Sequence, residues 1–96
     1  MMANPHYVTE TCTLRRVVSN PKCRYKWTQH ALEQMTKRGI NTADVICALT
    51  NGQVIFEEYK QDIIWRVAGR DIDNASLQVE AVVYEESVTI KVVTAF

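Results

Sequence analysis

The sequence predicts an α+β fold in which N-terminal helices pack on one face of a four-stranded antiparallel β-sheet. Two observations predict it. Up to about residue 51 the apolar residues recur at helical spacing, whereas beyond Gly52 they alternate with polar residues in four runs separated by short turns. Consecutive strands with short connections form an antiparallel meander, and the helices are the only cover available for its apolar face.

The composition of the 96 residues is that of a globular protein with a balanced charge. A hydrophobic content of 47% with little glycine or proline predicts one domain over residues 9–96, preceded by a flexible tail over residues 1–8. Eleven Lys and Arg balance eleven Asp and Glu, so the formal net charge is zero. Because nucleic-acid affinity grows with the number of phosphates that a protein neutralises, a basic site in this chain has to be local.

Two of the three expected helices are short and lie at either end of the helical half. The spacing of Leu14 and Val17 predicts a helix over residues 9–18. Asn41, followed three residues later by Asp44, resembles a capping box that opens a helix ending near the Thr-Asn-Gly turn.

The helix between them has the clearest boundaries in the sequence. Thr28 is a suitable N-cap, because its hydroxyl can accept a hydrogen bond from a backbone N–H that has no partner within the helix. The helix is expected to run to Arg38 and to stop at Gly39, which tolerates a left-handed backbone. Leu32 and Met35 are expected on its buried side.

The four predicted strands are QVIFEEY, DIIWRVAGR, LQVEAVVY and VTIKVVTAF. Their alternation places a row of apolar residues on the face that the helices cover: Ile63, Trp65, Val67, Leu77, Val79, Ala81, Val83, Val88, Ile90 and Val92. The two tryptophans of the chain are assigned to the core. An earlier segment, CRYKW, also alternates and is expected to be a short strand or an extended lead-in to the helix opened by Thr28.

The opposite sheet face combines charged, polar and apolar side chains. Its members are Ile64, Arg66, Ala68, Gln78, Glu80, Val82, Tyr84, Thr89, Lys91 and Val93. A solvated sheet face looks like this in many antiparallel proteins, with cross-strand charge pairs such as Arg66 with Glu80. The alternative is a surface for a substrate or a partner. Arg66 and Arg70 are four residues apart, which keeps them on one face, and guanidinium groups suit phosphate geometry.

The three cysteines, Cys12, Cys23 and Cys47, are widely spaced and form neither a disulfide framework nor a recognisable metal motif. Reduced thiols fit a cytoplasmic protein, and no apolar run is long enough to span a membrane. No cofactor and no metal site are expected.

Several motifs together resemble a small bacterial family known as domain of unknown function 4258. They are W-T-x-H-A-L-E-Q-M-x-x-R-G-I from Trp27, then A-D-V, N-G-x-V-I-x-E, W-R-V-x-G-R-D-I-D and the closing I-K-V-V-T-A-F. The resemblance runs from about Leu14 to the C-terminus. It implies a fold but no established reaction.

The order of helices and strands is also distantly similar to that of BrnT-type and RelE-type ribonuclease toxins, which cleave RNA without a metal on a concave sheet face. Such cleavage needs a base for the 2′-hydroxyl proton, a cation for the pentavalent phosphate and an acid for the leaving oxygen. This likeness implies that the catalytic residues would be His30, Arg38 and Arg66. It implies that the binding residues would be Arg70, Glu80, Tyr84 and Lys91. Of these, Glu80 and Tyr84 could also transfer protons.

Simpler roles compete for the two helical candidates. His30 lies beside the narrow apolar stripe, where a hydrogen bond to the sheet or a loop would make it structural. Arg38 could pair with Glu33 or Asp44.

Two functions therefore stand side by side. One is a toxin–antitoxin-type ribonuclease or RNA-binding protein, whose partners would be RNA or a cognate antitoxin-like protein. The other is a non-catalytic module that binds a protein partner through its sheet face or edge, as the neutral charge favours. The sequence leaves the oligomeric state open, a homodimer included.

Overall fold

The computed structural model describes residues 6–96, which form three helices and five strands. In chain order these are α1 (Val8–Val18), β1 (Arg24–Trp27), α2 (Gln29–Arg38), α3 (Thr42–Asn51), β2 (Gln53–Tyr59), β3 (Ile63–Arg70), β4 (Ser76–Tyr84) and β5 (Thr89–Ala95). The α+β class is confirmed. α1 begins one residue earlier than expected, and residues 1–5 of the expected tail lie outside the described part of the chain.

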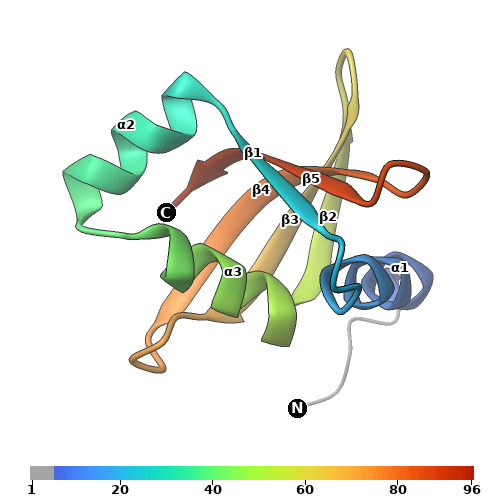
Figure 1. The fold of residues 1–96 in the computed structure, drawn as a ribbon, viewed down its shortest axis with the longest axis horizontal. Helices are drawn as coiled ribbons and strands as arrows, with labels where there is room; N and C mark the ends of the chain where they lie inside the picture. Colours follow the sequence, from blue (N-terminus) through green and yellow to red (C-terminus); the bar gives the residue numbers. More distant parts are fainter. Residues whose placement is uncertain (1–5) are drawn as a thin grey trace.

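The sheet has five strands and is mixed, which corrects the prediction of four antiparallel strands. Its order is β1-β5-β4-β3-β2, so the meander of β2 to β5 forms as expected. β1 joins it as an edge strand parallel to β5, with Arg24 beside Thr89 and Trp27 beside Val92. The extended segment before α2 therefore belongs to the sheet. Figure 1 shows β1 lying along β5 before the chain turns into α2.

The helices and one face of the sheet enclose a single hydrophobic core. α3 packs on β3 and β4, α2 packs on β5, and α1 packs on α3 and β2 (Figure 1). The fully buried side chains of largest volume are Leu14, Val45, Leu49, Val54, Val67, Val79, Ile90 and Val92. They come from α1, α3 and strands β2 to β5, which confirms that the helices cover most of the apolar rows of the sheet. Ile63 is the exception, because it lies at the start of β3 and is 48% exposed.

Side chains and one glycine set the ends of α2 and α3. The Thr28 hydroxyl accepts from the Ala31 N–H at 3.0 Å and donates to the Val93 carbonyl at 3.0 Å, so it caps α2 and ties it to β5. Gly39 ends α2 with a left-handed backbone at φ 66°. The expected capping box of α3 is present, with Asn41 and Asp44 each accepting a hydrogen bond from the other's backbone N–H.

No helix within residues 6–96 is long and apolar enough to cross a membrane.

Two β-bulges change which face the strand residues occupy. Val54 pairs with Val67 and Phe56 pairs with Arg66, so Ile55 between them has no partner in the register. In the same way, the pairing of β4 with β5 passes over Val93. A bulge shifts the alternation by one residue, so the residues beyond it point to the opposite face. Both bulges bear directly on the open face of the sheet.

Met35 is the anchor of α2, while Leu32 is not. Met35 is buried, but Leu32 is 41% exposed, which corrects the expectation that both are buried. Met35→Ala should lower the free energy of unfolding by about 2–5 kcal/mol, because it leaves a cavity between α2 and the sheet. Leu32→Ala, the matched control on the same helix, should cost about 1 kcal/mol or less. Urea denaturation followed by circular dichroism measures both, and equal losses would contradict this packing.

Candidate functional site on the open sheet face

The sheet face turned away from the helices carries a central ion pair. Arg66 on β3 and Glu80 on β4 are register partners. The Arg66 Nη2 and Nε both donate to Oε2 of Glu80, at 2.9 and 3.2 Å. This confirms the cross-strand charge pair expected from the sequence. The second carboxylate oxygen of Glu80, Oε1, accepts no hydrogen bond from the described residues.

Two aromatic rings flank the Arg66 guanidinium. Its Cζ lies 5.7 Å from the centroid of the Phe56 ring and 5.6 Å from that of the Phe96 ring, both within the range of cation–π attraction. The two bulges place these rings, because Phe56 follows the bulge at Ile55 and Phe96 follows the bulge at Val93. Both rings remain partly exposed, at 44% and 39%, so they can contact a ligand.

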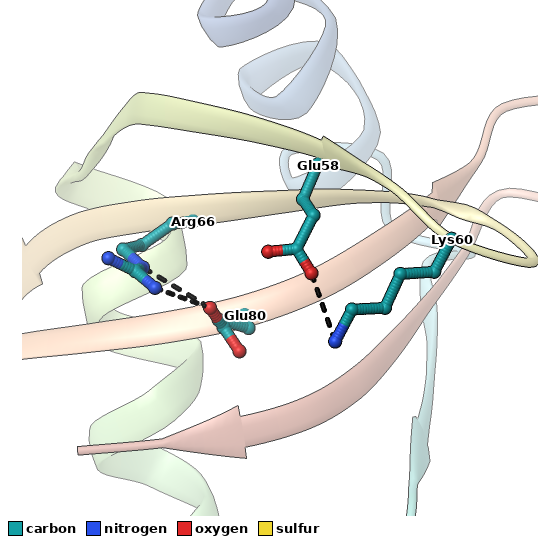
Figure 2. A network of polar contacts seen from close by, with 4 residues as sticks. All are labelled: Glu58, Lys60, Arg66 and Glu80. Carbon is teal, nitrogen blue, oxygen red and sulfur yellow. Dashed lines mark hydrogen bonds and ion pairs between the residues drawn. The ribbon is translucent and has the colours of Figure 1, made fainter.

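A second ion pair lies next to the first. Lys60, in the turn after β2, contacts Glu58 at 3.0 Å. Glu58 raises the pKa of Lys60 above its ordinary value, through a hydrogen bond and then through its charge, and Glu80 adds to the increase. Figure 2 shows the two pairs side by side, with Glu58 on β2, Lys60 in the turn after it, and Arg66 and Glu80 on β3 and β4.

We refer to these six residues as the Arg66 cluster: Phe56, Glu58, Lys60, Arg66, Glu80 and Phe96. They place a carboxylate with a free oxygen, two cations and two aromatic rings within one open surface. A carboxylate can accept a proton, an arginine can stabilise a phosphate that gains negative charge, and aromatic rings can stack on bases. The cluster therefore has the groups needed for chemistry on a nucleotide.

Lys91 and Tyr84 lie further along the same face. The Lys91 Nζ donates to Asp62 of the β2–β3 turn at 3.3 Å, and its hydrogen bonds with Asp62 and then with Tyr84 raise the pKa of Lys91. The turn borders an open hollow of about 370 Å³, which we call the Lys91 hollow. It is lined by Thr28, Lys60, Gln61, Asp62, Ile64, Val82, Lys91 and Val93.

The open face is less solvated than the sequence suggests. Val82, beneath the Lys91 hollow, and Thr89 are both buried at 5% exposure, although they point away from the helices.

The helical candidates stand apart from these side chains. His30 is exposed and makes no hydrogen bond or ion pair within residues 6–96. The expectation that a hydrogen bond holds it half-buried is wrong, since its position on α2 faces solvent. Arg38 is also exposed and pairs with neither Glu33 nor Asp44, whose carboxylate caps α3.

Arg70 lies at the far end of β3 and does not join Arg66. Its Nη1 donates to the Asn74 carbonyl at 3.0 Å in the β3–β4 turn. Arg66 instead contacts Glu80, so the two guanidinium groups have separate partners despite sharing a strand face. Arg70 borders a second hollow of about 620 Å³, between the end of α3 and the β3–β4 turn.

Within residues 6–96 no group of three or more His, Cys, Asp or Glu side chains is arranged to hold a metal ion. The three cysteines are free thiols.

Four members of the Arg66 cluster were not predicted from the sequence: Phe56, Glu58, Lys60 and Phe96. A signal for the two aromatic residues exists. Three apolar residues in a row, Val54 to Phe56, interrupt the alternation of β2, and Val92 followed by Val93 interrupts that of β5. Such interruptions are typical of bulges, which often lie next to functional sites.

The comparisons with known proteins identify a family but no relative of known activity. Neither the curated proteins nor the solved structures contain a match to the chain. A family model, Domain of unknown function (DUF4258), matches residues 27–96. The match begins at Trp27 rather than near Leu14, so α1 and most of β1 precede it. Because it covers α2, α3 and four strands of the sheet, the chain belongs to the DUF4258 family.

Proposed function

We propose that this protein binds single-stranded RNA on its open sheet face and cleaves it without a metal ion. The single observation that supports the proposal most is the position of Arg66, which lies between two exposed aromatic rings and contacts a carboxylate with a free oxygen. Bases would stack on Phe56 and Phe96, as unpaired bases do on aromatic side chains in many RNA-binding surfaces. A phosphate between two stacked bases would then lie close to Arg66.

The proposed reaction is an internal transesterification. Glu80 takes the proton of the 2′-hydroxyl through its free Oε1, and the 2′-oxygen forms a bond to phosphorus. Arg66 stabilises the additional negative charge on the phosphate oxygens. The bond from phosphorus to the 5′-oxygen breaks, and the Lys60 ammonium donates a proton to that oxygen. The products are a 2′,3′-cyclic phosphate and a 5′-hydroxyl end.

The test is cleavage of a short oligouridine labelled at its 5′ end, in excess chelator. The wild-type protein should produce cyclic-phosphate ends, and an oligonucleotide with a 2′-deoxyribose at every position should stay intact, because it lacks the nucleophile. Arg66→Gln should lower kcat/KM by about 10²–10³-fold. Arg70→Gln is the matched control, since it removes a cation from the same strand outside the Arg66 cluster and should lower kcat/KM by less than about tenfold.

A second function is favoured by the charges of the same face. Three of its cations, Lys60, Arg66 and Lys91, each contact a carboxylate, so the part of the face around the Arg66 cluster is neutral and releases few counterions on binding RNA. A protein surface with charges of both signs would fit it equally well. If the wild-type protein neither binds nor cleaves the oligouridine, the ribonuclease proposal is wrong and this second function remains.

A further inference from the structure

We propose that the free edge of β1 binds an extended acidic segment of another protein as a sixth strand of the sheet. The inference is independent of the proposed ribonuclease activity, because it concerns the sheet edge and not the Arg66 cluster. Four observations support it: the direction of the backbone groups of β1, two unpaired cations, a partly covered opposite edge, and the charge repulsion that a second copy would meet.

Alternate backbone groups of β1 have no partner strand. The Arg24 N–H donates to the Val88 carbonyl and the Thr28 N–H donates to the Val92 carbonyl, so the even-numbered residues face β5. Because the direction alternates along a strand, the N–H and C=O groups of Tyr25 and Trp27 point away from β5. β1 is the last strand of the sheet on this side, and no described residue bonds to those groups.

The side chains of β1 give this edge a definite chemistry. Arg24 and Lys26 are exposed on the open-face side, and neither has an ion pair or a side-chain hydrogen bond within residues 6–96. Lys26 is moreover the register partner of Lys91, a second cation whose own counter-charge is Asp62. On the other side Tyr25 and Trp27 stack, with ring centroids 6.1 Å apart. A matching strand would alternate acidic residues with apolar ones.

The opposite edge of the sheet differs because α1 covers part of it. The Val54 N–H on β2 donates to the Thr11 hydroxyl at 3.0 Å, and Arg15 donates to the Gly52 carbonyl at 3.3 Å. Helix α1 thus occupies backbone groups that an added strand would need. We therefore expect an added strand to pair with β1 and not with β2. The family model matches residues 27–96, so it includes only the last residue of β1. Membership of the family therefore does not by itself imply this edge.

Charge determines which kind of strand fits. A second copy of the chain would place Arg24 and Lys26 opposite the same cations, and like charges opposite one another on paired strands are destabilising. Nucleic acid could neutralise the two cations through its phosphates, but it would not supply the alternating N–H and C=O groups that Tyr25 and Trp27 require. An acidic peptide segment satisfies both requirements.

The test uses a capped nine-residue peptide that alternates Glu with Val, and a control peptide with Lys in place of Glu. Hydrogen exchange followed by NMR should show the amides of Tyr25 and Trp27 slowing at least tenfold when the Glu peptide saturates the protein. The amides of Arg24 and Lys26, already bonded to β5, should change little. Binding of the Glu peptide without slower exchange at Tyr25 and Trp27 would overturn the proposal.

Charge reversal provides the second arm. Arg24→Glu with Lys26→Glu should transfer the preference to the Lys peptide, whereas Lys37→Glu with Arg38→Glu, the same charge change at the far end of α2, should keep the preference for the Glu peptide. Lys26→Gln, a milder change, should weaken binding several-fold. An unchanged preference in the β1 double variant would overturn the proposal. The proposal would also be overturned if the Glu peptide failed to bind while a nine-nucleotide oligouridine bound in a way that required Arg24 and Lys26.

Discussion

Glu80→Gln is expected to reduce the RNA cleavage proposed for this protein by about 10²–10⁴-fold, the contribution typical of a positioned general base. Glutamine keeps the size of the side chain and can still accept the hydrogen bonds that Arg66 donates to Oε2. It cannot take the proton of a 2′-hydroxyl. Binding of an all-2′-deoxy oligonucleotide should therefore change by less than about tenfold, so that the loss lies in kcat rather than in KM.

Two neighbouring variants separate the role of a base from that of a structural ion pair. Tyr84→Phe leaves the Arg66 cluster intact and should preserve most of the activity, since Tyr84 contacts Lys91 at the other end of the face. Glu80→Ala removes both the base and the contact to Arg66, so it should weaken RNA binding as well as cleavage. If Glu80→Gln retains full kcat with an unchanged dependence on pH, Glu80 is not the base and the proposed chemistry is wrong.

The local signals in the sequence identify most elements of the fold, because capping and alternation act over a few residues. Thr28, Gly39 and the Asn41–Asp44 box define the helix ends in the structure as they do in the sequence. The position of β1 could not be predicted in the same way. Its four residues pair with β5 about 65 positions later along the chain, and a parallel pair has no connecting turn that could reveal it.

The candidate site was predicted less completely than the fold. Arg66 and Glu80 were found because regular alternation holds across β3 and β4. Phe56 and Phe96 were missed because each lies beyond a bulge, and one extra residue moves every later side chain to the other face. His30 and Arg38 were predicted from the chemistry that the likeness to ribonuclease toxins requires, and not from their place in the fold. Both residues are exposed because the sheet buries the other side of α2. Which side is buried depends on tertiary packing, and a narrow apolar stripe does not specify it.

The second large effect is expected at Gly69, where the backbone of β3 lies close against the backbone of α3. A Cβ at this position would collide with the carbonyl oxygen of Ala48 and would lie 2.8 Å from its carbonyl carbon and 2.9 Å from its Cα. These are backbone atoms of α3, so no side-chain rotation can relieve the contact. α3 would have to move away from β3, and with it Val45 and Leu49, which are fully buried beneath it.

Gly69→Ala should consequently lower the free energy of unfolding by about 3 kcal/mol or more, at or above the upper end for overpacking a core. In a domain of this size that loss corresponds to a fall of roughly 12–24 °C in Tm, measured by calorimetry. Gly39→Ala is the matched control: nothing lies within 4 Å of its added Cβ, and only the left-handed backbone costs about 1–2 kcal/mol. Adding Ala48→Gly to Gly69→Ala should not restore stability, because the colliding atoms belong to the backbone. Rescue by that second change, or a loss no larger than that of Gly39→Ala, would show that α3 does not depend on a glycine to reach the sheet.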